Sequence, residues 1–255
     1  MNRIELCQKK YESLFQNELQ DHPTDKEFMD ILQRFIFGEV FYVGALDDKL
    51  RELITVTILA VQQTLPQLKG HVGAALNIGN SPIEIRETIY QCAPFIGFPK
   101  TLNAIAVMNE VFTERKISLP LENQETRKDE ERYEKGIMIQ EDIYGAEIKD
   151  KYQYLPQDMG NDLSRFLTEL CFGDFYTRKG LSVQVRELLV LCILATIPAK
   201  EQLYSHALGN LKVGNTLETM YAALIHCIPY IGFPNGFNAI NTLKPLHEKI
   251  NSTES

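Results

Sequence analysis

The chain has 255 residues, of which 44% are hydrophobic and 24% are charged, with 15 glycines and 11 prolines. This composition is typical of a folded globular protein and excludes a disordered or collagen-like chain. The formal net charge is −8. We therefore expect no binding to nucleic acid, which needs a basic face. A locally positive pocket for a small anion is compatible with an acidic protein.

The apolar runs are too short to cross a bilayer, which takes about 20 residues. The longest runs are Leu53–Ala60 and Leu188–Ala195, and residues 1–16 lack the apolar segment of a secretory signal. These features predict a cytoplasmic protein that does not enter a membrane. The five cysteines form no Cys-x-x-Cys pair and no cluster with histidines at metal-ligand spacing. We expect reduced thiols, no metal site and no cofactor.

An internal repeat is the most informative feature of the chain. Residues 51–112 align with residues 186–247 without a gap, and 21 of the 62 aligned pairs are identical. About four identities are expected from background composition. The match extends upstream, where FGEVF at 37–41 faces FGDFY at 172–176. The chain is therefore predicted to hold two copies of one unit, 1–120 and 121–255, joined by a polar linker near 118–130.

Both copies are predicted to be helical. Residues 67–78 and 202–213 carry apolar side chains at spacings of three and four, as amphipathic helices do. Gly79 and Gly214 are expected to end those helices, and Ser81 followed by Pro82 begins the next one. Neither copy alternates with period two for long. We expect an all-α fold with about six helices in each copy and no sheet.

A small set of polar residues recurs between two copies that differ at about two thirds of their positions. The set comprises Arg51 and Arg186, Glu52 and Glu187, Gln67 and Gln202, His71 and His206, and Asn103 and Asn238. Glu52 lies within an apolar helix, and His71 lies on the helix that follows it. A turn near residues 63–66 leaves them offset by about 3 Å along the helix axis. We expect the pair to meet directly or through one water, either for acid–base chemistry or only to fix the packing of two helices.

The same residues resemble the carboxymuconolactone decarboxylase family, which also contains the alkylhydroperoxidase D-like proteins. The resemblance lies in RELITVTILA (51–60), HVGAALNIG (71–79), FIGFPKTLNAI (95–105), ERYEKGIMIQEDIYG (131–145) and FGDFYTRKGLSVQVREL (172–188). It covers nearly the whole chain, twice. It implies an all-α, alkylhydroperoxidase D-like fold for each copy and oligomers built around a helical hairpin.

The resemblance distinguishes the two branches of the family by their thiols. In the peroxidase branch, a Glu is followed after eleven residues by Cys-x-x-Cys and, three residues later, by His. The two cysteine positions are Thr64 and Gln67 in the first copy, and Ala199 and Gln202 in the second. A thiol peroxidase needs an attacking thiolate and a resolving thiol. The missing dithiol favours the decarboxylase branch, a lyase that acts on a small carboxylated lactone or related acid.

The resemblance also implies roles for the repeated residues. His71 and His206 would transfer the proton, and Glu52 and Glu187 would orient each imidazole and raise its basicity. Gln67 and Gln202 would bind the substrate carbonyl. The candidates for the substrate carboxylate are Arg51, Arg186 and Arg178, the last of which is replaced by Val43 in the first copy.

Two other functions remain open at this point. One is a hydroperoxidase-type redox protein that uses an unpaired thiol such as Cys92 or Cys227, although both lie in apolar surroundings that favour an inert core cysteine. The other is a non-catalytic oligomeric binder of small molecules. In every case we expect a homo-oligomer, with a trimer of tandem chains favoured, because a fused pair can replace two subunits of a ring.

Overall fold

The computed structural model describes residues 1–146 and 151–254, and this part of the chain is all-helical, with no strand. The first repeat contains α1 (Arg3–Phe15), α2 (Lys26–Gly38), η1 (Val40–Tyr42), α3 (Asp48–Gln62), α4 (Leu65–Asn77), α5 (Pro82–Tyr90), α6 (Ala93–Ile96) and α7 (Phe98–Glu114). The second contains η2 (Asp129–Glu131), α8 (Arg132–Tyr144), α9 (Met159–Phe166), η4 (Leu167–Tyr176), α10 (Val183–Thr196), α11 (Lys200–Lys212) and α12 (Leu217–Glu254).

The helix ends lie where the sequence places them. Ser81 caps α5 by accepting a bond from the Glu84 backbone, and the Glu84 side chain reaches back to the Ser81 backbone. Gly97 has φ +83° and separates α6 from α7, and Gly232 has φ +78° and kinks α12 at the equivalent point. The single long α12 thus corresponds to α5, α6 and α7 of the first repeat. The prediction of about six helices in each copy is confirmed.

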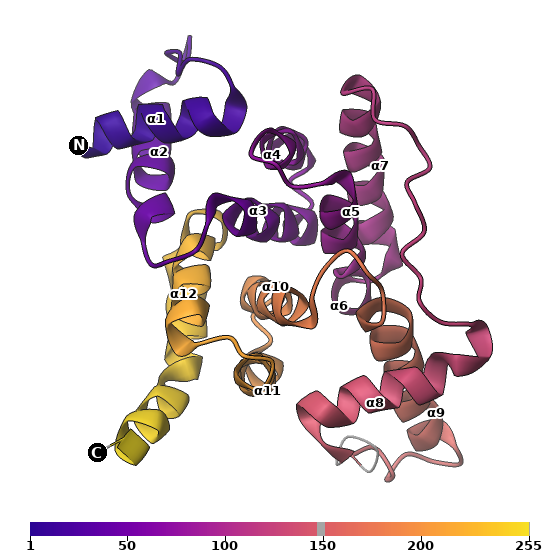
Figure 1. The fold of residues 1–255 in the computed structure, drawn as a ribbon. Helices are drawn as coiled ribbons and strands as arrows, with labels where there is room; N and C mark the ends of the chain where they lie inside the picture. Colours follow the sequence, from indigo (N-terminus) through magenta and orange to yellow (C-terminus); the bar gives the residue numbers. More distant parts are fainter. Residues whose placement is uncertain (147–150, 255) are drawn as a thin grey trace.

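The two repeats share one hydrophobic core. α3 and α10 lie side by side at the centre of the molecule, with α4 and α11 next to them (Figure 1). One continuous cluster of buried side chains contains Ile54 and Ile58 from α3 together with Leu189 and Ile193 from α10. Burial of each such side chain contributes about 1.5–3 kcal/mol. The repeats are therefore mutually dependent in folding.

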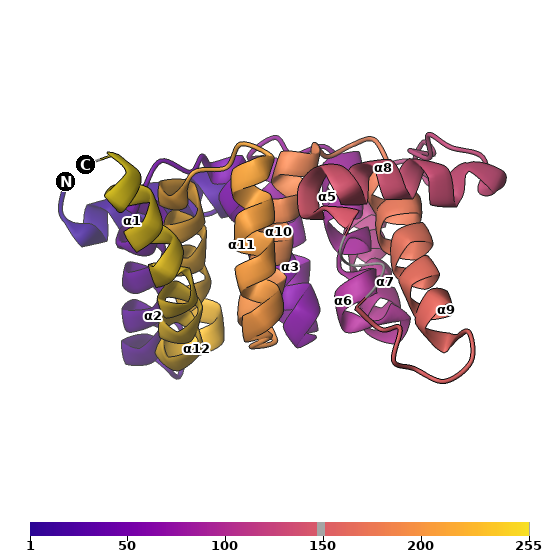
Figure 2. The ribbon, with the colours of Figure 1, turned by 90° about the horizontal axis from the view of Figure 1, so that it is seen from below.

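Each repeat packs its first helices against the last helices of the other repeat. α2 lies beside α12, and η4 lies beside α6 (Figures 1 and 2). The rings of Phe35 on α2 and Phe233 on α12 are 6.1 Å apart, and Phe95 on α6 packs against the cluster that contains Phe172 of η4. This approximate twofold arrangement brings one aromatic residue of each repeat to the other repeat's candidate site.

Residues 115–128, which connect α7 to η2, contain no helix and lie against the second repeat. The Thr126 hydroxyl donates to the Thr177 carbonyl at 2.7 Å, and the Lys179 backbone donates to the Gln124 carbonyl at 2.9 Å. None of the described helices has the length and apolar character needed to cross a membrane.

Candidate active site

A carboxylate and an imidazole meet directly in both repeats. Glu52 of α3 lies 2.8 Å from Nδ1 of His71 on α4, and Glu187 of α10 lies 3.0 Å from Nδ1 of His206 on α11. Both carboxylates are fully buried, whereas the histidine side chains keep 12% and 15% of their surface exposed. The expected approach of the two groups is therefore direct and needs no bridging water.

In the second repeat, two tyrosine hydroxyls complete the surroundings of Glu187. The Tyr144 hydroxyl donates to Glu187 Oε2 at 2.6 Å and lies 2.6 Å from His206 Nδ1, while the Tyr176 hydroxyl donates to Glu187 Oε1 at 2.5 Å. Burial, together with the charge of Glu187, raises the pKa of both tyrosines. They remain protonated and donate to both oxygens of the Glu187 side chain.

Space for the Tyr144 hydroxyl depends on Gly209 of α11. A Cβ atom at position 209 would lie 2.9 Å from the Tyr144 hydroxyl and 2.9 Å from Glu187 Oε2. The first repeat has Ala74 at the equivalent position. The absence of a side chain at Gly209 is thus matched to the presence of a hydroxyl on Tyr144.

The first repeat replaces both tyrosines by phenylalanine. The Phe15 ring contacts His71 and Phe37 at 5.6 and 5.7 Å, as the Tyr144 ring contacts its own histidine and phenylalanine at 5.1 and 5.8 Å. Phe41 aligns with Tyr176 in the register of the repeat. As a result, Glu52 Oε1 is buried without a hydrogen-bond partner among the described residues.

Each site also receives a ring from the other repeat. Phe95 lies 5.8 Å from the His206 ring, and its counterpart Tyr230 lies 6.1 Å from the His71 ring. Both contacts are edge-on, which favours the interaction of aromatic rings. The two candidate sites are therefore built by the tandem pair and not by either repeat alone.

A cavity of about 320 Å³ lies beside His206. Its walls include Phe95, Tyr144, Tyr152, Leu167, Cys171, Phe172 and Leu194, and its polar groups are Lys151, Glu201, Gln202, Ser205 and His206. The volume is at the lower end of the range for small-molecule sites. Sequence reasoning did not anticipate Lys151, because it lies outside the aligned part of the repeat and no motif marks it.

The glutamines predicted to bind substrate lie differently in the two repeats. Gln202 lines the cavity beside His206. Gln67 lies on α4, one turn before His71, and is exposed. Only the glutamine of the second repeat thus belongs to the described cavity.

The three predicted arginines lie away from that cavity. Arg51 donates to the backbone carbonyls of Val43 at 2.6 Å and Leu46 at 3.1 Å. Arg186 donates to the Arg178 carbonyl at 3.1 Å, and the Arg178 side chain binds Glu87 at 2.8 and 3.0 Å. These bonds hold the loops before α3 and α10, and none of the three arginine side chains lines the cavity beside His206.

A buried charged cluster joins the two repeats at Glu87 of α5, which is fully buried. Its carboxylate binds the guanidinium groups of Arg86, Arg178 and Arg186. The equivalent position in α12 is Ala222. The charged interface between the repeats is therefore one-sided.

On the opposite side, His226 of α12 replaces Gln91 of α5. Its Nε2 lies 3.0 Å from the Thr55 hydroxyl, and its Nδ1 lies 3.5 Å from the Arg51 guanidinium. Burial, and then the charges of Arg51 and His71, lower the pKa of His226 to about 3. His226 is consequently a neutral, internally bonded residue at neutral pH.

The thiols are poorly placed for redox chemistry. All five cysteines are free and buried. Burial raises the pKa of Cys92 to about 12, and burial together with the charge of Glu187 raises that of Cys171, which lines the cavity. A reactive cysteine needs an accessible thiolate. Among the described residues, no group of three metal-ligating side chains gathers to hold a metal ion.

The fold and the site define a class of tandem all-helical proteins with a buried carboxylate–imidazole pair in each half. The chain belongs to the carboxymuconolactone decarboxylase family, whose model matches residues 26–110 and 161–245. The family expected from the sequence is thus confirmed.

Three relatives each match a stretch of this chain that is about as long as one repeat. A 4-carboxymuconolactone decarboxylase of Acinetobacter baylyi is 24% identical over 106 residues, 42% of this chain and 79% of that protein. The nitrosuccinic acid decarboxylase npaB of Metarhizium robertsii is 26% identical over 92 residues, 36% of this chain and 64% of that protein. An uncharacterized 15.0 kDa protein of Paracoccus denitrificans is 38% identical over 87 residues, 33% of this chain and 64% of that protein.

A solved structure covers the full length of the chain. It is a protein of Burkholderia xenovorans assigned as a gamma-carboxymuconolactone decarboxylase subunit, with a TM-score of 0.55 and 18% identity over 100% of this chain and 99% of that one. At this identity the likeness shows the fold alone. It supports the tandem helical architecture described above.

Proposed function

We propose that this protein is a carboxy-lyase that removes carbon dioxide from a small carboxylated lactone or a related acid, in the cavity beside His206. The proposal rests on one observation: the Glu187–His206 pair is joined by Tyr144 and borders a cavity that also contains a lysine. Two relatives named as decarboxylases support the reaction class. The burial of all five thiols argues against the hydroperoxidase alternative.

The chemistry requires a proton donor at carbon. When the bond between the carboxylate carbon and its neighbouring carbon breaks, carbon dioxide leaves and the electron pair of the bond stays with the neighbouring carbon. An adjacent electron-withdrawing group delocalises this pair, and the neighbouring carbon must then receive a proton. Glu187 and Tyr144 occupy Nδ1 of His206 and leave Nε2 for the substrate. The imidazolium, held by the Glu187 carboxylate, would donate that proton from Nε2 and be recharged from water. General acid catalysis of this kind contributes about 10²–10⁴-fold.

Two further side chains of the cavity have roles in this proposal. Lys151 supplies a positive charge that attracts the substrate carboxylate, and Gln202 offers an amide that can donate to its carbonyl oxygen. Arg51, Arg186 and Arg178, expected from the sequence to bind the carboxylate, receive no substrate role here because their guanidinium groups are bonded within the fold. We assign Glu52 and His71 to packing.

The test is turnover by the purified full chain. The protein would be mixed with 4-carboxymuconolactone or with nitrosuccinic acid, the compounds in the names of the two relatives, and the release of carbon dioxide would be followed. We expect release from at least one of them, and incorporation of one deuterium at carbon in heavy water. Glu187→Gln should reduce the rate strongly, with Glu141→Gln on the exposed face of α8 as the matched control. Release no faster than the uncatalysed reaction, for both acids, would reject the proposal as stated.

We also infer a homo-oligomer, with a trimer of tandem chains favoured. Large apolar side chains are exposed at equivalent positions of the two repeats, as expected for a surface that self-associates. The equivalent pairs are Phe28 and Leu163, Ile31 and Phe166, Phe98 and Phe233, and Leu102 and Phe237. Light scattering after gel filtration should give three times the chain mass of 29.2 kDa. A monomeric mass at micromolar concentration would contradict this inference.

A further inference from the structure

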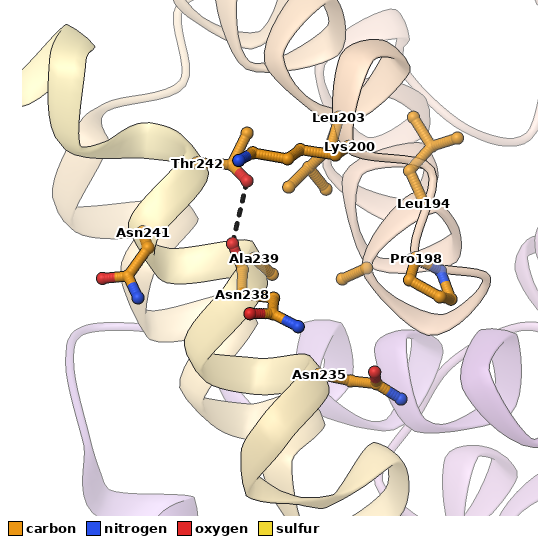
Figure 3. A pocket seen from close by; sticks show the side chains of 10 residues that line it. Leu194, Pro198, Lys200, Leu203, Asn235, Asn238, Ala239, Asn241 and Thr242 are labelled. Carbon is orange, nitrogen blue, oxygen red and sulfur yellow. Dashed lines mark hydrogen bonds between the residues drawn. The ribbon is translucent and has the colours of Figure 1, made fainter.

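A second cleft, of about 410 Å³, opens between α12 and the turn that joins α10 to α11 (Figure 3). Its floor contains the buried side chains of Leu194, Leu203 and Ala239. Asn235 and Asn238 stand along one wall, and Pro198 stands across from them. Among the residues that the structure describes, Leu194 is the one that lines both this cleft and the cavity beside His206.

In the first repeat, a glutamine side chain fills the equivalent position. The Gln63 amide nitrogen donates to the carbonyl of Ala60 at 2.6 Å and to that of Lys100 at 2.9 Å. Its amide oxygen accepts a bond from Asn103 at 2.9 Å. The first repeat thus binds one primary carboxamide through two carbonyl acceptors and one asparagine donor.

The second repeat keeps the groups that receive the carboxamide but loses the carboxamide itself. Ala195, Asn235 and Asn238 are the counterparts of the three residues that bind Gln63, and all three line the cleft. Pro198 stands in place of Gln63. It brings neither a side-chain amide nor a backbone N–H. The presence of the same asparagine in both copies therefore has no explanation in the Glu–His chemistry.

We propose that this cleft binds a small molecule through a primary carboxamide. The amide nitrogen of the ligand donates to the backbone carbonyls of Ala195 and Asn235, and its oxygen accepts from the Asn238 side chain. The aliphatic part of the ligand rests on Leu194 and Leu203. A primary carboxamide has two N–H donors and one carbonyl acceptor, as the Gln63 side chain does. A ketone or an ester has no donor, so the cleft should prefer an amide.

The probe is propionamide, which reproduces the end of a glutamine side chain. Binding would be followed by the ¹⁵N–¹H spectrum of the full chain, in which the Asn238 side-chain amide and the Ala239 backbone should shift and saturate in the millimolar range, as suits a ligand of about five heavy atoms. Butanone, which has the same shape but no N–H donor, is the control. We expect it to bind about tenfold more weakly, since it has no N–H group and cannot donate to either carbonyl. Equal shifts with both compounds, or no saturable shift, would overturn the proposal.

Two reciprocal variants make the test independent of decarboxylase activity. Pro198→Gln should fill the cleft with its own carboxamide and abolish the propionamide shifts at Asn238. Gln63→Ala should open the equivalent cleft of the first repeat and create new shifts at Asn103. If Pro198→Gln leaves the titration unchanged, the propionamide binds elsewhere and the cleft is not its site. The helical circular dichroism of each variant shows that it remains folded.

Discussion

The two Glu–His pairs have the same spacing but opposite surroundings. In the second repeat, Tyr144 and Tyr176 donate to both oxygens of Glu187. In the first, phenylalanines stand in both places, and one oxygen of Glu52 is buried without a partner among the described residues. A repeated pair of residues therefore does not define a repeated site. The residues around the pair decide whether it can do chemistry or only packs two helices.

The strongest effect should separate the two histidines. His206→Asn should reduce the rate of decarboxylation by about 10²–10⁴-fold because it removes the proposed proton donor. His71→Asn should leave the rate nearly unchanged, since Phe15 and Tyr230 pack against its ring and no proton transfer is assigned to it. Steady-state kinetics on both variants show which of the two histidines the reaction needs.

The relative losses in these two variants show whether the repeats differ in function. Equal losses would mean that both sites turn over, and that the hydroxyls around Glu187 are not required. A loss in His71→Asn alone would reverse the assignment. Thermal unfolding of both variants controls for indirect effects through the shared core.

The next effect concerns the one-sided charged interface. Glu87→Ala should destabilise the chain by about 3–5 kcal/mol because it leaves the buried Arg86 and Arg186 and the partly buried Arg178 without their carboxylate. Ala222 shows that the symmetric position accepts alanine where the counterparts of Arg86 and Arg178 are Tyr221 and Val43. Urea unfolding at neutral pH measures the change.

The matched control is Glu110→Ala on α7. Glu110 is 60% exposed and lies 3.6 Å from Lys69, which also pairs with Glu114. An exposed ion pair contributes about 0–1 kcal/mol. A loss from Glu87→Ala no larger than that of the control would show that the arginines find other partners and that the cluster does not hold the repeats together.

Sequence alone predicts the architecture and the central pair of each site. The gapless alignment of the two copies identifies the duplication, Ser81 and Gly214 mark helix boundaries, and the helical hairpin brings Glu52 to His71. These features are local or repeat within the chain. Hydrophobic periodicity and capping therefore suffice to predict them.

The partners of the pair are harder to find. Tyr176 stands opposite Phe41 in the aligned FGDFY and FGEVF segments, so the sequence carries that signal. Tyr144 corresponds to Phe15 only in a different register from the rest of the repeat, and the ring contacts alone reveal this. The direction of a long side chain is equally hard to predict from the sequence. Arg51 and Arg186 adjoin their glutamates in sequence yet turn to backbone carbonyls.

A smaller effect tests the hydroxyl of Tyr144. Tyr144→Phe copies Phe15 of the first repeat and should lower kcat by about 10–100-fold with little change in KM, because the hydroxyl positions His206 and does not hold the substrate. Gly209→Ala, which copies Ala74, should act in the same way, since its Cβ would occupy the space of the hydroxyl. Steady-state kinetics across the pH range would show an altered pH profile in both variants.

Tyr152→Phe is the control, because Tyr152 lines the same cavity without a bond to the Glu187–His206 pair. A wild-type kcat in Tyr144→Phe would remove the hydroxyl from the mechanism and leave the Glu–His pair intact. The double variant Tyr144→Phe/Gly209→Ala should be no worse than Gly209→Ala alone, since the two changes act on one contact.

The last effect is a dependence of stability on pH that comes from His226. The pKa of buried His226 is about 3, well below the usual 6.5, so between these values the unfolded chain binds a proton that the folded chain does not. Stability must then fall as the pH drops through this window, by about 1.4 kcal/mol for each pH unit. His226→Gln, which copies Gln91, should flatten the slope between pH 6 and about 4 by that amount, whereas His22→Gln at an exposed position should not. If urea unfolding gives equal slopes for His226→Gln and the unaltered chain, His226 is protonated in the folded state and its bonds to Arg51 and Thr55 must be rearranged.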